Sequence, residues 1–484
     1  MRRIKIISGI LALISAMIVG CHKDELTEKI PYSEIPDLVF RNYLLVHFDT
    51  DMDGFINRQE AMAVKEIDLR GIGDVKSLQG IEYFTSLEKL YIPGFIWLET
   101  LDLSHHLMLE VLDCSYIYGM SPDGYQNGLT LNISKNVKLK ELYCTHSHLN
   151  NLDLQNNIAL EILDCRNSIF ETLDLSNNKR LRIINCSHTT SKVIINEFQY
   201  LEEFYCEDVH IENDFLLSNI PLRVFYCTIS NNNFNFSNLP NLELLSMKYT
   251  YGGKLDLTKS TKLKYLTCEG GDYHVDISNC TALEELTWIS NHSVDISNNR
   301  ALKYLYYSNG DNNDLDISNN TALETIHFLN SDGKILSFKN NSSLKNVYIH
   351  MKDGEKYDFS NNFLLENLTL WGGINNGKFY NVEFDIKNCV NLTIGNCDLD
   401  IFDIRQCSLL KTVLISGCDN LSLINAAKLQ NLVSFRVTSS YFPKPIEADF
   451  SNCINLQQLE LPNVIRSLNL TGCTSLEGWP DYPR

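Results

Sequence analysis

Apolar residues recur along most of this chain with a period near 21 residues, starting at about residue 67. Residues 139–159 read LKELYCTHSHLNNLDLQNNIA, and residues 160–180 read LEILDCRNSIFETLDLSNNKR. Both follow one template: Leu-x-x-Leu-x-Cys, a polar stretch, then Leu-x-x-Leu-Asp-Leu. The template recurs with drift toward the C-terminus. The apolar residues of its first half suit a short strand whose side chains alternate between a narrow core and solvent.

A unit of this length predicts a repeat solenoid that consists mostly of β structure. Rungs of about 21 residues leave no room for a regular helix of average length beside two apolar segments. Each rung of a solenoid covers only its neighbours, so 484 residues need not divide into several globular cores. The hydrophobic content of 44% excludes global disorder. We expect the solenoid to occupy residues 67–484.

The repeats resemble the leucine-rich repeats of Bacteroidetes surface lipoproteins, which commonly place an EF-hand-like loop ahead of a cysteine-bearing repeat. Residues 77–92 (SLQGIEYFTSLEKLYI) resemble the first repeat of internalin-like proteins. The resemblance covers about residues 36–479 and implies a leucine-rich-repeat solenoid with a binding role. Residues 115–128 and 371–384 depart from the template, and we interpret them as insertions at loops.

The first twenty residues have the pattern of a signal peptide, with a basic start and an apolar run over residues 6–19. This run is too short for a spanning helix, which needs ~20 residues. Residues 18–21 (IVGC) resemble a lipobox, which implies cleavage before Cys21 and attachment of lipid to its thiol. The alternative is an ordinary secretory signal followed by a chance cysteine. Residues 23–25 (KDE) resemble a surface-export tag, so we expect residues 21–35 to form a tether from the outer membrane at the cell surface.

Residues 49–60 (DTDMDGFINRQE) match the twelve-residue EF-hand pattern, in which oxygen ligands alternate along a loop that turns at a central glycine. Residues 37–48 are apolar at helical spacing and residues 60–63 can start a second helix, which predicts an α-helical cap over residues 36–66. The alternative is an acidic turn without metal. No second loop is found, so we expect one structural calcium ion that clamps the cap onto the first rung. The predicted ligands are Asp49, Asp51, Asp53, the backbone carbonyl of Phe55, Asn57 and Glu60.

Most of the fifteen cysteines fall at two template positions. One column contains Cys114, Cys144, Cys165, Cys186, Cys206, Cys227 and Cys268, and other rungs hold Met247, Trp288 or Tyr307 there. A position that accepts any apolar side chain is a core position, so we interpret these cysteines as buried thiols. A second set, Cys280, Cys389, Cys407, Cys453 and Cys473, replaces asparagines that we expect to bond backbone groups at turns. Disulfides between rungs and a metal array are the alternatives.

Template position 5 should point to solvent, and it predicts a stripe of aromatic side chains along one sheet face. Its predicted binding residues are Tyr143, Tyr205, Tyr226, Tyr249, Tyr306, His327 and Tyr348, with Tyr265, Tyr304, His350 and Trp371 as neighbours. Tyrosine suits recognition because it offers apolar area and a hydroxyl at low entropic cost. The alternative is that tyrosine simply favours strands. A second column of aspartates, from Asp102 to Asp316, is interpreted as hydrogen-bonded to turn amides.

Charge and motifs narrow the function. A net charge of −19 argues against nucleic acid and anionic lipid surfaces as partners. The chain contains no P-loop, no HExxH, no GxSxG and no dinucleotide fingerprint, so we do not expect an enzyme. The prediction is a non-catalytic surface module that binds proteins or mediates adhesion. A glycan-capture lipoprotein for nutrient uptake and a structural envelope component are the alternatives.

Overall fold

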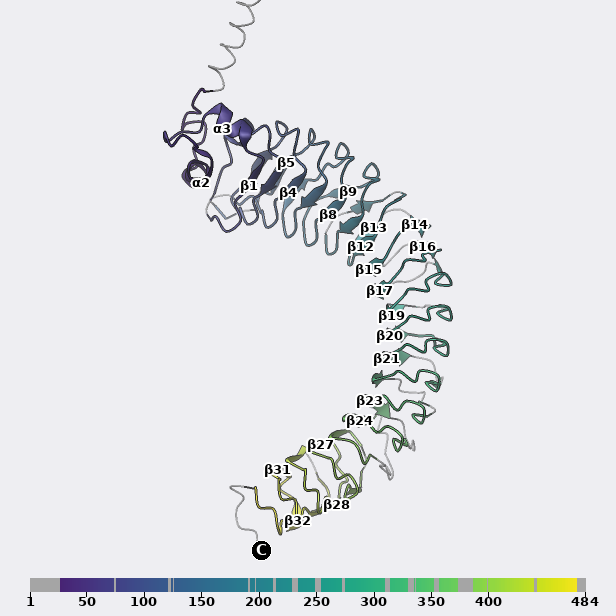
Figure 1. The fold of residues 1–484 in the computed structure, drawn as a ribbon. Helices are drawn as coiled ribbons and strands as arrows, with labels where there is room; N and C mark the ends of the chain where they lie inside the picture. Colours follow the sequence, from purple (N-terminus) through teal and green to yellow (C-terminus); the bar gives the residue numbers. More distant parts are fainter. Residues whose placement is uncertain are drawn as a thin grey trace, which may run out of the picture. The chain divides into compact units, whose positions relative to one another are not determined.

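Short parallel strands follow one another along the chain from β1 to β32 (Figure 1). This computed structural model describes residues 27–476 with gaps. It leaves out residues 1–26, 74, 121, 122, 125, 190, 191, 196, 212–214, 229–233, 249–253, 272–274, 310–313, 330–334, 336, 352–356, 373–385, 398, 439–441 and 477–484. The chain divides into two units, Met1–Phe234 and Asn235–Arg484.

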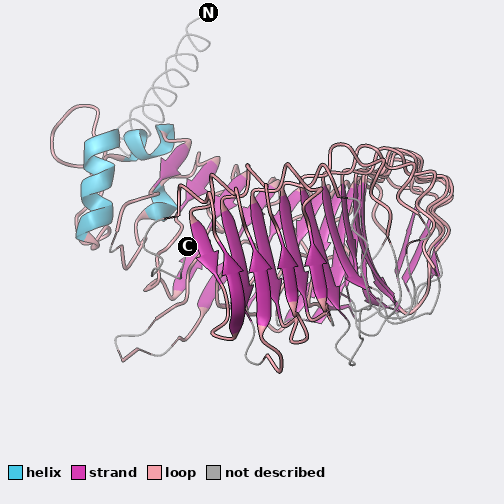
Figure 2. Cartoon of the chain, turned by 90° about the horizontal axis from the view of Figure 1, so that it is seen from below, coloured by secondary structure: helices cyan, strands magenta, loops and turns pink. Residues whose placement is uncertain are grey.

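Helical segments lie at the start of the first unit, where they are cyan in Figure 2. They are α2 (Leu38–Phe48), α3 (Arg58–Ala63) and the 3₁₀ turn η1 (Ile81–Tyr83). Asp37 caps α2, because its Oδ1 accepts the N–H groups of Val39 and Phe40 at 3.0 and 2.9 Å. Its Oδ2 accepts the N–H of Lys76 at 2.8 Å, so the same carboxylate holds α2 to the region of the first rung.

In the first unit, one long parallel sheet is built from the first strand of each rung. Its strands are β1 (Glu66–Asp68), β2 (Lys89–Tyr91), β4 (Val111–Asp113), β6 (Glu141–Tyr143), β8 (Ile162–Asp164), β10 (Ile183–Asn185), β12 (Glu203–Cys206) and β15 (Val224–Thr228). The second half of each rung forms shorter sheets. These contain β3 (Thr100–Asp102), β5 (Leu129–Asn132) and β7 (Leu149–Asn151), and then β9 (Thr172–Asp174), β11 (Lys192–Ile194) and β13 (His210–Ile211). Strand β14 (Phe215–Ser218) lies between β13 and β15 in the chain.

The second unit repeats this arrangement. Its long sheet contains β17 (Leu244–Lys248), β19 (Tyr265–Gly271), β20 (Glu285–Ser290), β21 (Tyr304–Asn309), β22 (Thr325–Phe328), β23 (Asn346–Met351), β24 (Asn367–Gly372), β25 (Asn391–Gly395), β27 (Thr412–Ser416), β29 (Ser434–Thr438) and β31 (Gln458–Glu460). Shorter pairings join β16 (Phe234–Ser237) to β18 (Lys254–Leu255), and β26 (Ile401–Asp403) through β28 (Leu423–Asn425) and β30 (Ile446–Asp449) to β32 (Ile465–Asn469). A β solenoid with rungs near 21 residues was the predicted fold class, and it is confirmed.

Equivalent template positions pair across neighbouring rungs, so each position forms a column. Phe204 pairs with Phe225 and Cys206 with Cys227 between β12 and β15, and all four side chains are buried. In the second unit the cysteine column continues as Met247, Cys268, Trp288, Tyr307 and Phe328, each at most 1% exposed. The column is therefore core, as predicted. All fourteen cysteines that the structure describes are thiols rather than disulfides.

A second buried column ties each rung to the preceding one. Asn320 Nδ2 donates to the carbonyls of Ile296 and Asn299, both at 2.9 Å. Equivalent pairs of bonds are made by Asn136, Asn157, Asn178, Asn299, Asn341 and Asn362. Where cysteine replaces asparagine, the Cys453 thiol lies 3.1 Å from the Ala426 carbonyl. The predicted substitution of cysteine for a turn-bonding asparagine is confirmed.

The aspartate column forms turns of its own. Asp276 Oδ1 accepts the backbone N–H of Ser278 at 2.8 Å, and these hydrogen bonds with Ser278 lower the pKa of Asp276. The same bond, two residues along, is made by Asp102, Asp153, Asp174, Asp256, Asp295, Asp316 and Asp358. The predicted turn hydrogen bonds are confirmed.

A column of alternating charge borders each long sheet, and this feature was not predicted. In the second unit it runs Glu284, Lys303, Glu324, Lys345 and Glu366, one residue per rung. Lys303 Nζ lies 2.7 Å from a Glu284 oxygen, and Lys345 Nζ lies 2.7 Å from a Glu324 oxygen. In the first unit, Lys140 pairs with Glu110 at 2.8 Å and Arg182 with Glu202 at 3.0 Å. We call these residues the charge column.

Candidate functional site

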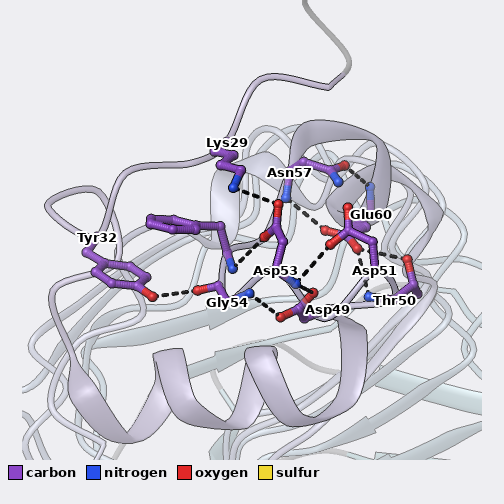
Figure 3. Close-up of polar contacts among 10 residues, drawn as sticks. Lys29, Tyr32, Asp49, Thr50, Asp51, Asp53, Gly54, Asn57 and Glu60 are labelled. Carbon is purple, nitrogen blue, oxygen red and sulfur yellow. Dashed lines mark hydrogen bonds and ion pairs between the residues drawn. The ribbon is translucent and has the colours of Figure 1, made fainter.

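Three carboxylates converge in the loop between α2 and α3 (Figure 3). The oxygens that Asp49, Asp51 and Asp53 offer all lie within 4.8 Å of one another. Asp49 is fixed by the backbone N–H groups of Asp53, at 3.2 Å, and of Gly54, at 2.9 Å. Gly54 has a φ of +83°, which only glycine adopts without strain, so the sharp turn requires it. The structure therefore brings together three of the predicted calcium ligands.

Asn57 and Glu60, the later predicted ligands, contact each other at the start of α3. Glu60 Oε2 accepts the N–H of Asn57 at 2.9 Å, and Asn57 Oδ1 accepts the N–H of Glu60 at 2.9 Å. This reciprocal capping box begins the helix. Glu60 Oε1 also accepts the N–H and the hydroxyl of Thr50 at 2.7 and 2.8 Å, so its carboxylate joins the two ends of the loop (Figure 3). The Asn-x-x-Glu spacing is the sequence signal for this second role.

A lysine ahead of the loop belongs to the site and was not predicted. Lys29 Nζ lies 2.7 Å from Asp53 Oδ2 (Figure 3). Its segment is held in place by the backbone, because the N–H of Ile30 donates to the carbonyl of Ile56 at 2.8 Å and Lys29 forms an antiparallel bridge with Asn57. The sequence around Lys29 does not predict this contact, because α2 lies between Lys29 and Asp53 in the chain.

Phe55, which was expected to offer its backbone carbonyl, follows Gly54 in the loop. Its ring stacks on Tyr32 with centroids 4.7 Å apart, and Lys29 Nζ lies 4.6 Å from the Phe55 ring centroid. The Tyr32 hydroxyl donates to the Gly54 carbonyl at 2.5 Å. The segment before α2 therefore packs against the loop through side chains as well as through backbone bonds.

The electrostatics of the loop fit a hard divalent cation. The pKa of Asp51 is raised, first by desolvation and then by the carboxylates of Asp53, Glu60 and Asp49. The Lys29 ammonium lowers the pKa of Asp53, but one lysine leaves the other carboxylates uncompensated. Oxygen-rich, negatively charged loops are the ligand sets that calcium prefers. Within the described part of the chain, no other group of three acidic, histidine or cysteine side chains converges in this way.

The outward face of the long sheet in the first unit carries one part of the predicted stripe. Tyr205 and Tyr226 stack with ring centroids 5.4 Å apart and planes 16° apart. The Tyr205 hydroxyl donates to Glu203 at 3.0 Å, and the Tyr143 hydroxyl donates to Glu141 at 3.0 Å. Burial and the adjacent glutamate raise the pKa of each of these two hydroxyls to about 12. We call Tyr143, Tyr205 and Tyr226, with their glutamates, the tyrosine face.

The second unit carries another part of the stripe. The rings of Tyr306 and His327 stack 5.7 Å apart, and those of His327 and Tyr348 stack 5.7 Å apart. These three residues are called the aromatic column. Tyr249 lies outside the described residues. The predicted stripe is therefore interrupted: in the first unit Asp164 and Asn185 separate Tyr143 from the stacked pair of Tyr205 and Tyr226.

Cys21, predicted to carry lipid, and the leader before it also lie outside the described residues. None of the helices within the described ranges combines the length and the apolar character that crossing a membrane requires.

Comparisons with known proteins bear on the fold. No family model matches the chain, and no curated protein matches it. Among solved structures, the functional domain of InlJ from Listeria monocytogenes, described as including a cysteine ladder, has a TM-score of 0.53 at 18% identity. The similarity covers 90% of this chain and 85% of that one. The fold is a leucine-rich-repeat solenoid.

YopM from Yersinia enterocolitica is also similar to this leucine-rich-repeat solenoid, with a TM-score of 0.48 and 15% identity over 84% of this chain and 96% of YopM. At 18% identity the similarity to the InlJ domain shows the fold alone and leaves the ligand open, because one solenoid fold supports many functions.

Proposed function

We propose that this leucine-rich-repeat protein is a non-catalytic binding module, lipid-anchored at the outer membrane through Cys21, that holds a protein partner on its tyrosine face. The observation that carries the proposal is the ordered tyrosine array. Tyr205 and Tyr226 are stacked, and the Tyr205 hydroxyl is fixed by Glu203. Their rings lose little freedom on binding, which favours affinity.

The charge around the tyrosine face indicates the character of the partner. Glu141 and Glu203 lie beside the tyrosine hydroxyls, and Asp164 occupies the same column between Tyr143 and the later tyrosines. A chain of net charge −19 repels acidic surfaces and steers basic ones toward it. We therefore propose a protein with an exposed basic patch.

The calcium loop supports this function from one end of the solenoid. We propose that one calcium ion binds Asp49, Asp51 and Asp53, with Asn57, Glu60 and the Phe55 carbonyl completing the set. The ion would neutralise the crowded carboxylates, and Glu60 would keep joining the ends of the loop. Its role is structural, because a single loop packed against the first rung has no paired partner loop with which to act as a sensor.

The test measures binding of the full chain, in mild detergent, to arrays of purified extracellular and bacterial surface proteins. We expect hits among basic proteins, with affinity reduced about tenfold or more by Tyr205→Ala with Tyr226→Ala, since aromatic anchors dominate interfaces. Tyr200→Ala is the matched control, because Tyr200 is exposed and lies outside the sheet face. A silent protein array, or hits that survive the double substitution, would contradict the proposal.

A further inference from the structure

The outward face of strands β21–β25 carries no carboxylate, lysine or arginine among its described strand positions. These positions are Tyr304, Tyr306, Ser308, Thr325, His327, Asn346, Tyr348, His350, Asn367, Thr369, Trp371, Asn391, Thr393 and Gly395. Burial lowers the pKa of both His327 and His350, so both are neutral at pH 7. We call this surface the uncharged face.

The two lysines beside the uncharged face are already paired, and Glu285, on the strand before it, is a carboxylate in register with Tyr304. Lys303 binds Glu284 and Lys345 binds Glu324 across neighbouring rungs of the charge column. On a chain of net charge −19, five adjacent strands thus present a surface with no charge to attract an ionic ligand. An anionic ligand would meet the repulsion of the whole molecule, and the described positions of these strands hold no cation to offset it.

Three asparagines on this face form an ordered amide ladder. Asn367 Nδ2 donates to Asn346 Oδ1 at 2.6 Å, and Asn391 Nδ2 donates to Asn367 Oδ1 at 2.7 Å. Thr325 and Thr412 close the two ends, through bonds of 3.1 and 2.6 Å. Each amide has a second N–H and a second lone pair, and the ladder holds these in fixed directions. The face therefore offers a row of pre-oriented donors and acceptors.

Aromatic rings run beside the amide ladder and are held just as firmly. The Trp371 ring lies against the backbone of Gly395 on the next strand, where any side chain would collide with it. The Tyr348 hydroxyl lies 3.2 Å from His350 Nε2. The aromatic column of Tyr306, His327 and Tyr348 continues the platform across three strands. Glycine at 395 is what allows a ring to lie flat there.

We propose that the uncharged face binds a neutral oligosaccharide. Sugar rings combine an apolar face of C–H groups with a rim of hydroxyls that both donate and accept hydrogen bonds. Aromatic platforms match the first property, and the amide ladder matches the second. Both sets of groups are ordered before binding, so little side-chain entropy is lost when the ligand docks. This site is separate from the tyrosine face and differs from it in ligand class.

The experiment titrates the full chain in mild detergent with maltohexaose, cellohexaose, xylohexaose and mannohexaose, and with hexagalacturonate as an anionic counterpart. Calorimetry gives affinities, and tryptophan fluorescence reports on Trp371. We expect at least one neutral hexasaccharide to bind and hexagalacturonate not to bind. Trp371→Ala and Asn367→Leu should each weaken binding about tenfold or more, since each removes a preformed contact. Tyr205→Ala with Tyr226→Ala should leave it unchanged.

A thermal melt of every variant checks that the fold is retained, and Trp371→Phe, which keeps a ring over Gly395, should restore part of the affinity. Silence of all four neutral hexasaccharides would overturn the proposal, as would tighter binding of hexagalacturonate or binding that Trp371→Ala leaves intact. If Trp371→Ala instead abolished binding of a protein, this face would be assigned to a protein partner. The oligosaccharide proposal would then be overturned as well. Protein binding is tested by the tyrosine-face variant and oligosaccharide binding by the Trp371 and Asn367 variants. Either proposal can therefore fail without the other.

Discussion

Each position of the buried asparagine column requires only that the side chain donate a hydrogen bond. Asn320 Nδ2 serves two carbonyls, while its Oδ1 has no partner among the described protein groups. The substitutes in other rungs share the donor: the Ser260 hydroxyl binds the Leu239 carbonyl at 3.1 Å, and His106 Nε2 lies 2.9 Å from the Ile81 carbonyl. This explains why cysteine, a weak donor, is tolerated at the position.

Substitutions at Asn320 should therefore rank by donor capacity. Asn320→Ala removes one of the two hydrogen bonds that each carbonyl accepts, since Ile296 and Asn299 also accept backbone N–H groups, and should lower the free energy of unfolding by about 1–3 kcal/mol. Asn320→Cys should cost less, and Asn320→Asp should cost most, because a carboxylate would face two carbonyl oxygens. Urea unfolding followed by circular dichroism measures the order.

Asn319→Ala is the matched control, because Asn319 is exposed and should change stability by no more than about 0.5 kcal/mol. If Asn320→Asp proved as stable as the wild type, the donor argument would be wrong.

The turn aspartates make stability sensitive to acid. Hydrogen bonds with the serine two residues on lower the pKa of Asp276, Asp316 and Asp358 below the ordinary value of 3.8. Their contribution is therefore complete above that ordinary value and is lost as the pH falls through the lower folded values. We expect the melting temperature to fall below about pH 4, and the triple Asp→Asn variant to flatten this fall, because asparagine keeps the accepting oxygen at every pH.

The comparison uses melting temperatures from pH 7 down to pH 2, with Glu285→Gln as the control for loss of an exposed carboxylate. If the melting temperature of the triple variant fell as steeply with acid as that of the wild type, these turns would not be the cause of the acid sensitivity.

At the scale of elements, the cap shows which parts of the structure local sequence determines. Asp37 and Asn57 begin helices where their residue types predict, and Gly54 turns the loop where the pattern requires it. Lys29 could not be predicted, because its partner Asp53 is reached only after α2 has folded back. The amide ladder could not be predicted either. Asn346, Asn367 and Asn391 are polar residues at outward positions where the template allows any residue type.

Calcium should stabilise this cap. We expect calcium to raise the melting temperature of the full chain and EDTA to lower it, and Asp51→Asn with Asp53→Asn to abolish the response. Ion concentrations near one hundred times the dissociation constant should add about 2.7 kcal/mol. Asp51 and Asp53 each accept one loop N–H, which the oxygen of asparagine can still accept, whereas Asp49 accepts two and Glu60 also caps α3.

Glu34→Gln, which neutralises a carboxylate outside the loop, should leave the calcium response intact. A wild-type melt that neither calcium nor EDTA moves would contradict the calcium role, and the Lys29–Asp53 pair would then be the loop's own neutralising contact.

At the scale of the whole molecule, the thiols report on folding. Burial raises the pKa of Cys186 to about 12 and of Cys453 to about 11, so few native thiols should react at pH 8. Denatured, unreduced protein without Cys21 should titrate close to fourteen thiols. Cys473, the described cysteine that is not fully buried, should react first in the native state. Labelling with a maleimide and mass spectrometry give both results, and a count near zero after denaturation would mean disulfides.

The repeat period alone predicted the architecture, because each rung solves the same packing problem with the same residue types. What it could not give is how neighbouring rungs differ. The tyrosine face has carboxylates beside Tyr143 and Tyr205, whereas the strands around Tyr348 have none. Those differences arise at the outward positions, where packing does not constrain the side chain, and they decide which ligand each unit can hold.

The charge column limits how this chain can change in length over evolution. Loss of one repeat, such as the rung bearing Lys303, would place Glu284 beside Glu324 and replace an attraction with a repulsion. Loss of two consecutive repeats would restore the alternation, and the buried asparagines would accept either event because every rung presents the same carbonyls. Natural variants of this protein should therefore differ by even numbers of repeats where the column is charged, and odd differences should fall where it is not, as at Val390 and Val433.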